Sequence, residues 1–125
     1  MLSDRVVARF LTGKTLEGNL ILFDPADGIL KLRTGSEERD VDCSILKAIF
    51  FLRQPNKTPF SEILLKPAGK KVRVTFADGE EITGYSYGLH PLEEGFYLFP
   101  VNKKDQNERI YVIKKNAIQI RTEIK

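Results

Sequence analysis

The stretch Val6-Val7-Ala8-Arg9-Phe10-Leu11-Thr12-Gly13 decides the fold, because its pattern returns 66 residues later as Val72-Arg73-Val74-Thr75-Phe76-Ala77-Asp78-Gly79. Both stretches alternate apolar side chains with others, which is typical of a β-strand with one buried face. Both then reach a glycine, the residue that most readily adopts the positive φ angle of a hairpin turn. The repeat predicts that the chain is an internal duplication.

The alignment of the two halves extends past these stretches. The same shift pairs Gly18 with Gly84. A glycine at the same place inside two strands predicts a strong bend, of the kind that closes a small barrel. Later pairings are looser, and they match Glu38-Arg39 with Glu108-Arg109 and Ala48-Ile49 with Ala117-Ile118. Each half is therefore expected to repeat the same series of strands.

Five short strands are expected in each half. They cover about residues 5–10, 15–23, 29–34, 39–43 and 47–52, and again about 71–76, 81–87, 95–100, 109–114 and 117–122. The segment Asp24-Pro25-Ala26-Asp27-Gly28 has the composition of a turn. Short strands at this spacing predict an all-β protein built from small closed or nearly closed barrels, since open sheets would leave edges that invite pairing.

The predicted organisation is two tandem five-stranded barrels, residues 1–53 and 70–125, joined by a linker over residues 54–69. Within the linker, Pro59 suits a first helical position and Pro67 would end a helix, so a short helix is expected between them. Each half is close to the lower size limit for an independent hydrophobic core. The two barrels are therefore expected to pack against each other.

Composition limits the classes of function. The chain has 125 residues, of which 42% are hydrophobic and 30% are charged, and these values are ordinary for a globular domain. The longest apolar run, residues 48–52, is far shorter than the roughly 20 residues of a membrane-spanning helix. The single cysteine, Cys43, allows no internal disulfide, and no signal peptide opens the chain. A cytoplasmic location is therefore expected.

The net charge of +3 is mild, and its excess lies in the second half. Residues 1–62 carry 9 basic and 9 acidic side chains, whereas residues 63–125 carry 11 basic and 8 acidic ones. Nucleic-acid-binding domains usually show a denser basic patch than this. The asymmetry indicates only where a basic surface would lie.

The first half is expected to have an apolar outer face. Its members stand where the second half has more polar residues, and they are Val7, Ile21, Phe23, Phe50 and Leu52. An exposed apolar patch of this kind is normally covered. The covers considered are Ile63-Leu64-Leu65 of the linker, the second barrel and another chain, and contacts within the chain are favoured.

A spaced pattern of apolar residues and glycines carries a family resemblance. It is the run Val6-x-Ala8-x-Phe10-x-x-Gly13-x-x-x-x-Gly18-x-x-x-x-Phe23-Asp24, followed by Ile29-x-x-Leu32. The run is similar to the Sm-like family of SH3-like barrels, which includes the LSm and Hfq proteins, over residues 5–52 and more loosely over 71–122. The resemblance implies two SH3-like small barrels. The family's uridine pocket uses a loop Asn and an Arg-Gly or Lys-His pair, where this chain has Gly28 and Ser44-Ile45-Leu46-Lys47.

A fainter pattern joins Arg5-x-x-x-Arg9 to Asp42-x-Ser44. It resembles fragments of the motifs with which PilZ domains bind cyclic dinucleotides, although Lys47 stands where that family has glycine. Two arginines four residues apart on a strand more often form a solvated face. Cyclic-dinucleotide binding is accordingly the third function considered.

Residues that could support catalysis are few. The one histidine, His90, precedes a proline in a turn, and no Cys or His pairs have the spacing of metal ligands. The glycines lack the spacing of a phosphate-binding loop. We therefore expect no enzyme activity, no metal and no cofactor.

The second half has aromatic and basic residues that could form a platform for stacking nucleic-acid bases. They are Tyr85, Tyr87, Tyr97, Phe99, Lys71 and Arg73. Cross-strand packing explains the same aromatics equally well.

The sequence as a whole predicts a non-catalytic protein-interaction or scaffold module. A protein is the expected partner, and RNA bound on the aromatic and basic platform is the alternative. No membrane partner is expected, while an apolar outer face is compatible with a homo-oligomer.

Overall fold

A computed structural model describes residues 4–54, 70–86, 94–100 and 106–123, and within them the protein is all-β, as predicted. The first half contains β1 (Arg5–Phe10), β2 (Thr15–Asp24), β3 (Ile29–Thr34), β4 (Glu37–Asp42) and β5 (Leu46–Leu52). The second half contains β6 (Lys70–Thr75), β7 (Glu81–Ser86), β8 (Gly95–Leu98), β9 (Asn107–Ile113) and β10 (Gln119–Glu123). Two short 3₁₀ helices, η1 (Cys43–Ile45) and η2 (Lys114–Asn116), were not predicted. The expected linker helix lies outside the described residues.

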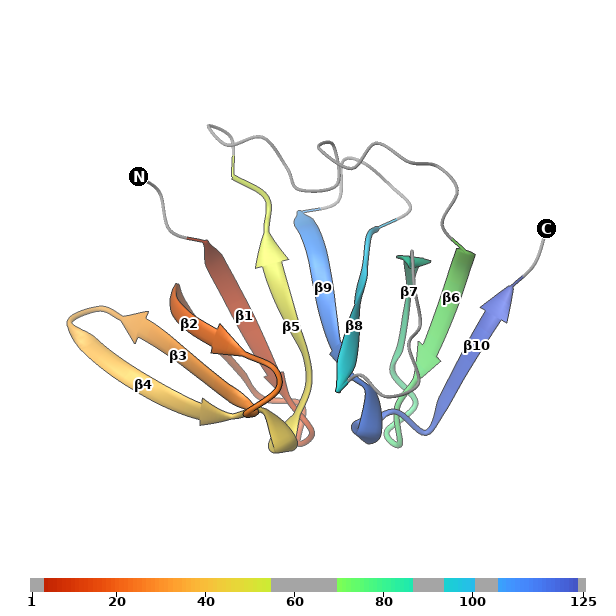
Figure 1. Ribbon diagram of the computed structural model, residues 1–125, viewed down its shortest axis with the longest axis horizontal. Helices are drawn as coiled ribbons and strands as arrows, with labels where there is room; N and C mark the ends of the chain where they lie inside the picture. Colours follow the sequence, from red (N-terminus) through yellow and green to blue (C-terminus); the bar gives the residue numbers. More distant parts are fainter. Residues whose placement is uncertain (1–3, 55–69, 87–93, 101–105, 124–125) are drawn as a thin grey trace.

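The strands form two antiparallel sheets. One has seven strands in the order β4-β3-β2-β1-β5-β9-β8, and the other has the order β10-β6-β7. A single bridge joins the sheets, in which Tyr85 and Phe99 exchange backbone hydrogen bonds of 2.8 and 2.9 Å. Figure 1 shows the strands following one another across the molecule from β4 to β10.

The expected closed barrels are not present. Within the described residues the series of strands begins at β4 and ends at β10, so neither half closes on itself. The reason is that β5 pairs with β9 of the other half instead of returning to β4. A ladder between the halves therefore occupies the edge that a closed first barrel would have used.

The pairing registers of the two halves recur at constant shifts. Val6 opposes Gly18 as Val72 opposes Gly84. The shift is 66 residues for the first three strands and becomes 71 for the last two. Both shifts follow from one comparison, because Ile29 opposes Asp42 in the first half and Gly95 opposes Ile113 in the second.

These registers correct the later part of the sequence alignment. Arg9 opposes Ala48, and Thr75, its counterpart, opposes Gln119. Ala48 therefore corresponds to Gln119 and not to Ala117, a difference of two residues. No glycine marks the register of these strands, so matching by residue identity slipped along them.

Gly18 and Gly84 occupy equivalent crowded places. A Cβ atom on Gly18 would lie 2.7 Å from the carbonyl oxygen of Arg33, and one on Gly84 would lie 2.7 Å from that of Phe99. Glycine is needed at both positions because a neighbouring strand approaches too closely for a side chain. The turn glycines Gly13 and Gly79 also agree, with φ angles of 93° and 92°.

Two hydrophobic cores lie on opposite faces of the central strands. The first core contains Val6, Ala8, Leu30, Leu32, Val41, Cys43, Leu46, Ile49, Phe51, Tyr111 and Ile113. The second core contains Ala48, Phe50, Val72, Val74, Phe76, Ile82, Phe96, Leu98, Ile110 and Val112. Strands β5 and β9 supply residues to both cores, because successive side chains of a strand point to opposite faces.

Candidate functional site: the seam and the free edge strands

The seam, which we define as the β5–β9 pairing, is an addition of one half's strand to the other half's edge. Its register opposes Ile49 to Tyr111 and Phe50 to Ile110. Ile49 and Tyr111 belong to the first core, and Phe50 and Ile110 belong to the second. The seam is thus buried on both sides.

A buried lysine connects the halves beside the seam. The side chain of Lys47 is 2% exposed, and its Nζ donates hydrogen bonds to Asp78 and, at 2.8 Å, to Glu80 Oε1. Desolvation lowers the pKa of Lys47, but the hydrogen bonds to the two carboxylates outweigh it and raise the pKa overall. The same bond from Lys47 lowers the pKa of Asp78. Arg9 also pairs with Glu80, so two cations of the first half hold the β6–β7 turn.

Further polar contacts tie the ends of the seam. Asn116 Nδ2 donates to the carbonyl oxygens of Ser44 at 2.9 Å and Leu46 at 2.7 Å. At the other end, the Arg109 guanidinium lies 4.0 Å from the centre of the Phe51 ring and pairs with Asp4 at 3.5 Å. These contacts fix the two halves relative to each other.

The structure separates the residues of the predicted apolar outer face. Val7 and Phe50 pack in the second core, so the second half covers them. Phe23 packs against the first core and does not face outward, because a bulge between Leu20 and Leu22 shifts the alternation of β2. Ile21 is 40% exposed and Leu52 is half-buried.

Three residues of the predicted platform share one surface with Phe99. Lys71 opposes Tyr85 across β6 and β7, and Tyr85 opposes Phe99 across the bridge to β8, so these side chains point to one face. Arg73 lies two residues along β6 on the same face. Lys71, Arg73 and Tyr85 are partly exposed, whereas Phe99 is buried.

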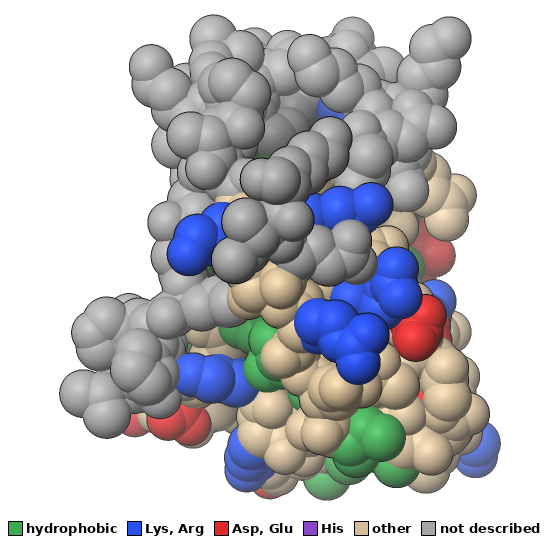
Figure 2. All heavy atoms as spheres, turned by 90° about the vertical axis from the view of Figure 1, so that its right-hand side faces the viewer, with side chains coloured by type: hydrophobic (Ala, Val, Ile, Leu, Met, Phe, Trp, Pro, Cys, Tyr) green, Lys and Arg blue, Asp and Glu red, His purple; other side chains and the backbone are tan. Residues whose placement is uncertain are grey.

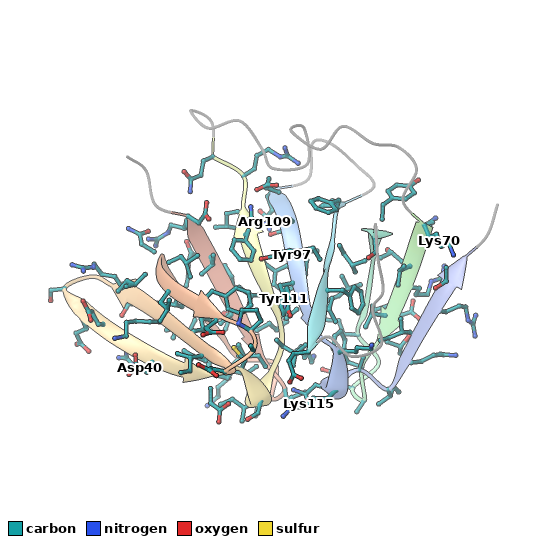
Figure 3. The ribbon with its side chains drawn as sticks, viewed as in Figure 1. Asp40, Lys70, Tyr97, Arg109, Tyr111 and Lys115 are labelled. Atoms are coloured by element: carbon teal, nitrogen blue, oxygen red, sulfur yellow. The ribbon has the colours of Figure 1, made fainter. Side chains whose placement is uncertain are left out.

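The other two aromatics are not part of this surface as described. Tyr97 packs against the first core, with its ring centroid 5.0 Å from that of Tyr111, and burial raises its pKa. Figure 3 shows Tyr97, Tyr111 and Arg109 together near β8 and β9, apart from Lys70 on β6. Tyr87, like His90, lies outside the described residues.

The sequence analysis left Arg121 out of the site. Arg121 is exposed on β10 and directly opposes Arg73 on β6. We call Lys71, Arg73, Tyr85 and Arg121 the basic face. Figure 2 views the molecule from the β10 side and shows Lys and Arg side chains gathered there. Two like charges directly opposite each other destabilise a sheet, so this pair is not explained by stability of the sheet alone.

The two strands at the ends of the series differ in charge. The β4 edge carries Glu37, Glu38, Asp40 and Asp42, all exposed, and is partly neutralised by ion pairs such as Arg33–Glu38 at 3.2 Å. The β10 edge carries the exposed Arg121. No strand among the described residues pairs with β10 on the side away from β6.

A cavity of about 190 Å³ lies between the halves, walled by the turn at residues 25–28, by η1 and by Tyr111 and Lys115. Asp42 in its wall accepts a bond from the Ser44 backbone N–H at 2.9 Å, which lowers the pKa of Asp42. Burial, and then the charge of Asp42, raise the pKa of Cys43 to about 11. The Cys43 thiol is therefore protonated at neutral pH and is a poor nucleophile.

The residues of the PilZ-like pattern have partners within the chain. Arg5 bonds to Glu17 and Asn19, each at 2.9 Å, and Arg9 pairs with Glu80. No group of His, Cys, Asp and Glu in the described ranges could hold a metal ion. None of the helices described has the length and hydropathy needed to cross a membrane.

These features define an all-β protein whose two halves share a central pair of strands and leave a basic face beside one free edge. The chain belongs to the family described as "Family of unknown function (DUF6982)", whose model matches residues 2–123. No curated protein and no solved structure is significantly similar to it.

Proposed function

We propose that the protein is a non-catalytic interaction module made of two related five-stranded units that arose by duplication. The recurrence of the pairing registers at constant shifts supports this origin. So do the equivalent crowded glycines, Gly18 and Gly84. The strand neighbours are also the same in each half: β5-β1-β2-β3-β4 corresponds to β10-β6-β7-β8-β9, which is consistent with the Sm-like and SH3-like resemblance.

The module binds a protein partner by strand addition to β10. The observation that carries this proposal is the seam, in which β9 adds to the edge of β5. Strand β10 is the counterpart of β5, and its outer edge has no partner among the described residues. An edge strand offers unpaired backbone N–H and C=O groups to an extended peptide, which is a recurring mode of protein recognition.

Selection from a displayed library of random decapeptides tests this function. The strongest binders are synthesised, and amide hydrogen exchange of the protein is measured with and without each. Strand addition protects the amides of β10 and leaves those of β4 unchanged. Binders that protect only amides elsewhere, or a selection that enriches no peptide, would refute the proposal.

RNA binding is a second candidate, because Tyr85 and Lys71 lie side by side on the basic face. Base stacking on an aromatic ring beside a cation is the usual mode of single-strand recognition. Binding of labelled single-stranded RNA by the protein, by a Tyr85→Ala, Arg73→Glu variant and by a Lys14→Glu control tests it. The candidate requires a salt-sensitive affinity that only the double variant loses.

A further inference from the structure

The same cross-strand pair occurs in both halves with opposite chemistry. In the first half Val7 opposes Phe50, and both pack in the second core beneath the added half. In the second half the corresponding residues are Arg73 and Arg121, which oppose each other in the same way. Arg73 and Arg121 therefore occupy the place at which, in the first half, the neighbouring unit docks.

We infer that the partner of β10 is an acidic extended strand whose alternate carboxylates contact Arg121 and Arg73. This inference rests on the proposed strand addition and specifies its chemistry. A strand beside β10 would place every second side chain on the same side as Arg121. Carboxylates there would compensate the Arg73–Arg121 juxtaposition, and Lys71 adds a third cation on that face.

A second copy of this chain does not fit the same edge. By the pattern of the seam, β4 of another molecule would add to β10 with the register of β9 on β5. Phe50 and Ile110, which face each other in the seam, correspond to Arg121 and Arg39. Two arginines would then be opposed. Asp40, the counterpart of Tyr111, would face the apolar Ile120. The chain thus carries its apolar docking residues once, at the seam.

The exposed chemistry favours a peptide over a nucleic acid. Of the described aromatics predicted for the platform, Phe99 is buried and Tyr97 packs against the first core, so Tyr85 alone is accessible on the basic face. Stacking of successive bases needs more than one accessible ring. Backbone pairing with β10 needs no aromatic ring at all.

Fluorescence anisotropy with labelled octapeptides tests the inference. The probes are alternating Glu-Val, alternating Ser-Val, alternating Lys-Val, and Glu-Val with every second amide N-methylated. A single-stranded deoxythymidine octamer is the nucleic-acid probe. We expect the Glu-Val peptide to bind about tenfold more tightly than the Ser-Val peptide, and the Lys-Val peptide not to bind. The Arg121→Gln variant should lose this preference. The Lys14→Gln control, which removes an exposed cation from the β1–β2 turn, should keep it.

The outcomes separate the inference from the proposed function. Equal binding of the Glu-Val and Ser-Val peptides, with protection of β10 amides, would overturn the acidic chemistry and leave strand addition standing. Binding of the Glu-Val peptide that N-methylation does not weaken would support recognition of carboxylates and overturn strand addition. Tighter binding of the oligonucleotide than of any peptide, lost in Arg121→Gln, would overturn the inference in favour of nucleic acid.

Discussion

Phe50 and Phe51 are adjacent in the chain and belong to different hydrophobic cores. Phe50 packs with Val72, Val74 and Phe76 of the second half, and Phe51 packs with the first core. Both rings are at most 7% exposed. One strand therefore links the stability of the two halves, since any displacement of β5 disturbs both cores.

Removing either ring should destabilise the whole protein. We expect Phe50→Ala and Phe51→Ala each to lower the free energy of unfolding by about 3–5 kcal/mol, because each leaves a cavity in a packed core. Chemical denaturation followed by far-UV circular dichroism and tyrosine fluorescence measures this. Both probes should report one transition at the same midpoint. Two separate transitions would show that the cores unfold independently.

The equivalent glycines should respond alike to a methyl group. Gly18→Ala and Gly84→Ala each force a Cβ against a backbone carbonyl at 2.7 Å, so each should cost about 1–3 kcal/mol of stability. Thr83→Ala, at an exposed position next to Gly84, is the control and should change stability by less. A shift of the thermal midpoint compares the three variants. Harmless replacement at only one glycine would contradict the equivalence of the two sites.

The Lys47–Asp78 bond should make stability depend on pH. The pKa of Asp78 is lower in the folded protein than in the unfolded chain, so its contribution is present above about pH 4. It is lost as the pH falls through the folded-state pKa. The difference in unfolding free energy between wild type and Asp78→Asn should therefore be largest near neutral pH and vanish in acid. Asp27→Asn, in an exposed turn, should show no such dependence. A difference that persists below pH 3 would contradict the bond's role.

Cys43 should be unreactive in the folded protein. With a pKa of about 11, only about a thousandth of its thiol is ionised at pH 8, and its side chain is 5% exposed. Iodoacetamide labelling followed by mass spectrometry should modify Cys43 slowly until denaturant is added. In a Ser36→Cys variant, the introduced cysteine in an exposed turn should react quickly under native conditions. Equal rates at both sites would mean that Cys43 is accessible.

Local signals predicted the strands because they depend on nearby residues. The alternation of Val6, Ala8 and Phe10 and the turn glycines Gly13 and Gly79 act within a few residues, and β1 and both turns lie where expected. The seam depends on contacts between residues about sixty positions apart, such as Ile49 with Tyr111, which alternation does not encode. One signal was present. Residues 48–52 and 110–113 are continuously apolar, which is typical of strands buried on both faces.

The basic face could be predicted only in part. Lys71, Arg73 and Tyr85 follow from strand alternation and the hairpin register. Arg121 was missed because the alignment slipped by two residues in β10, which hid its pairing with Arg73. Tyr97 was included because it shares a side of β8 with Phe99, but the sheet brings that part of the strand over the first core.

The ladder between β5 and β9 makes the covalent connection between the halves dispensable for their recognition. Fragments 1–54 and 70–125, expressed together, should reassemble through the backbone ladder and the Lys47 contacts, whereas each alone would expose half of a shared core. The protein is in this sense a natural candidate for a split reporter, whose complementation depends on strand recognition and not on the peptide chain that joins the parts.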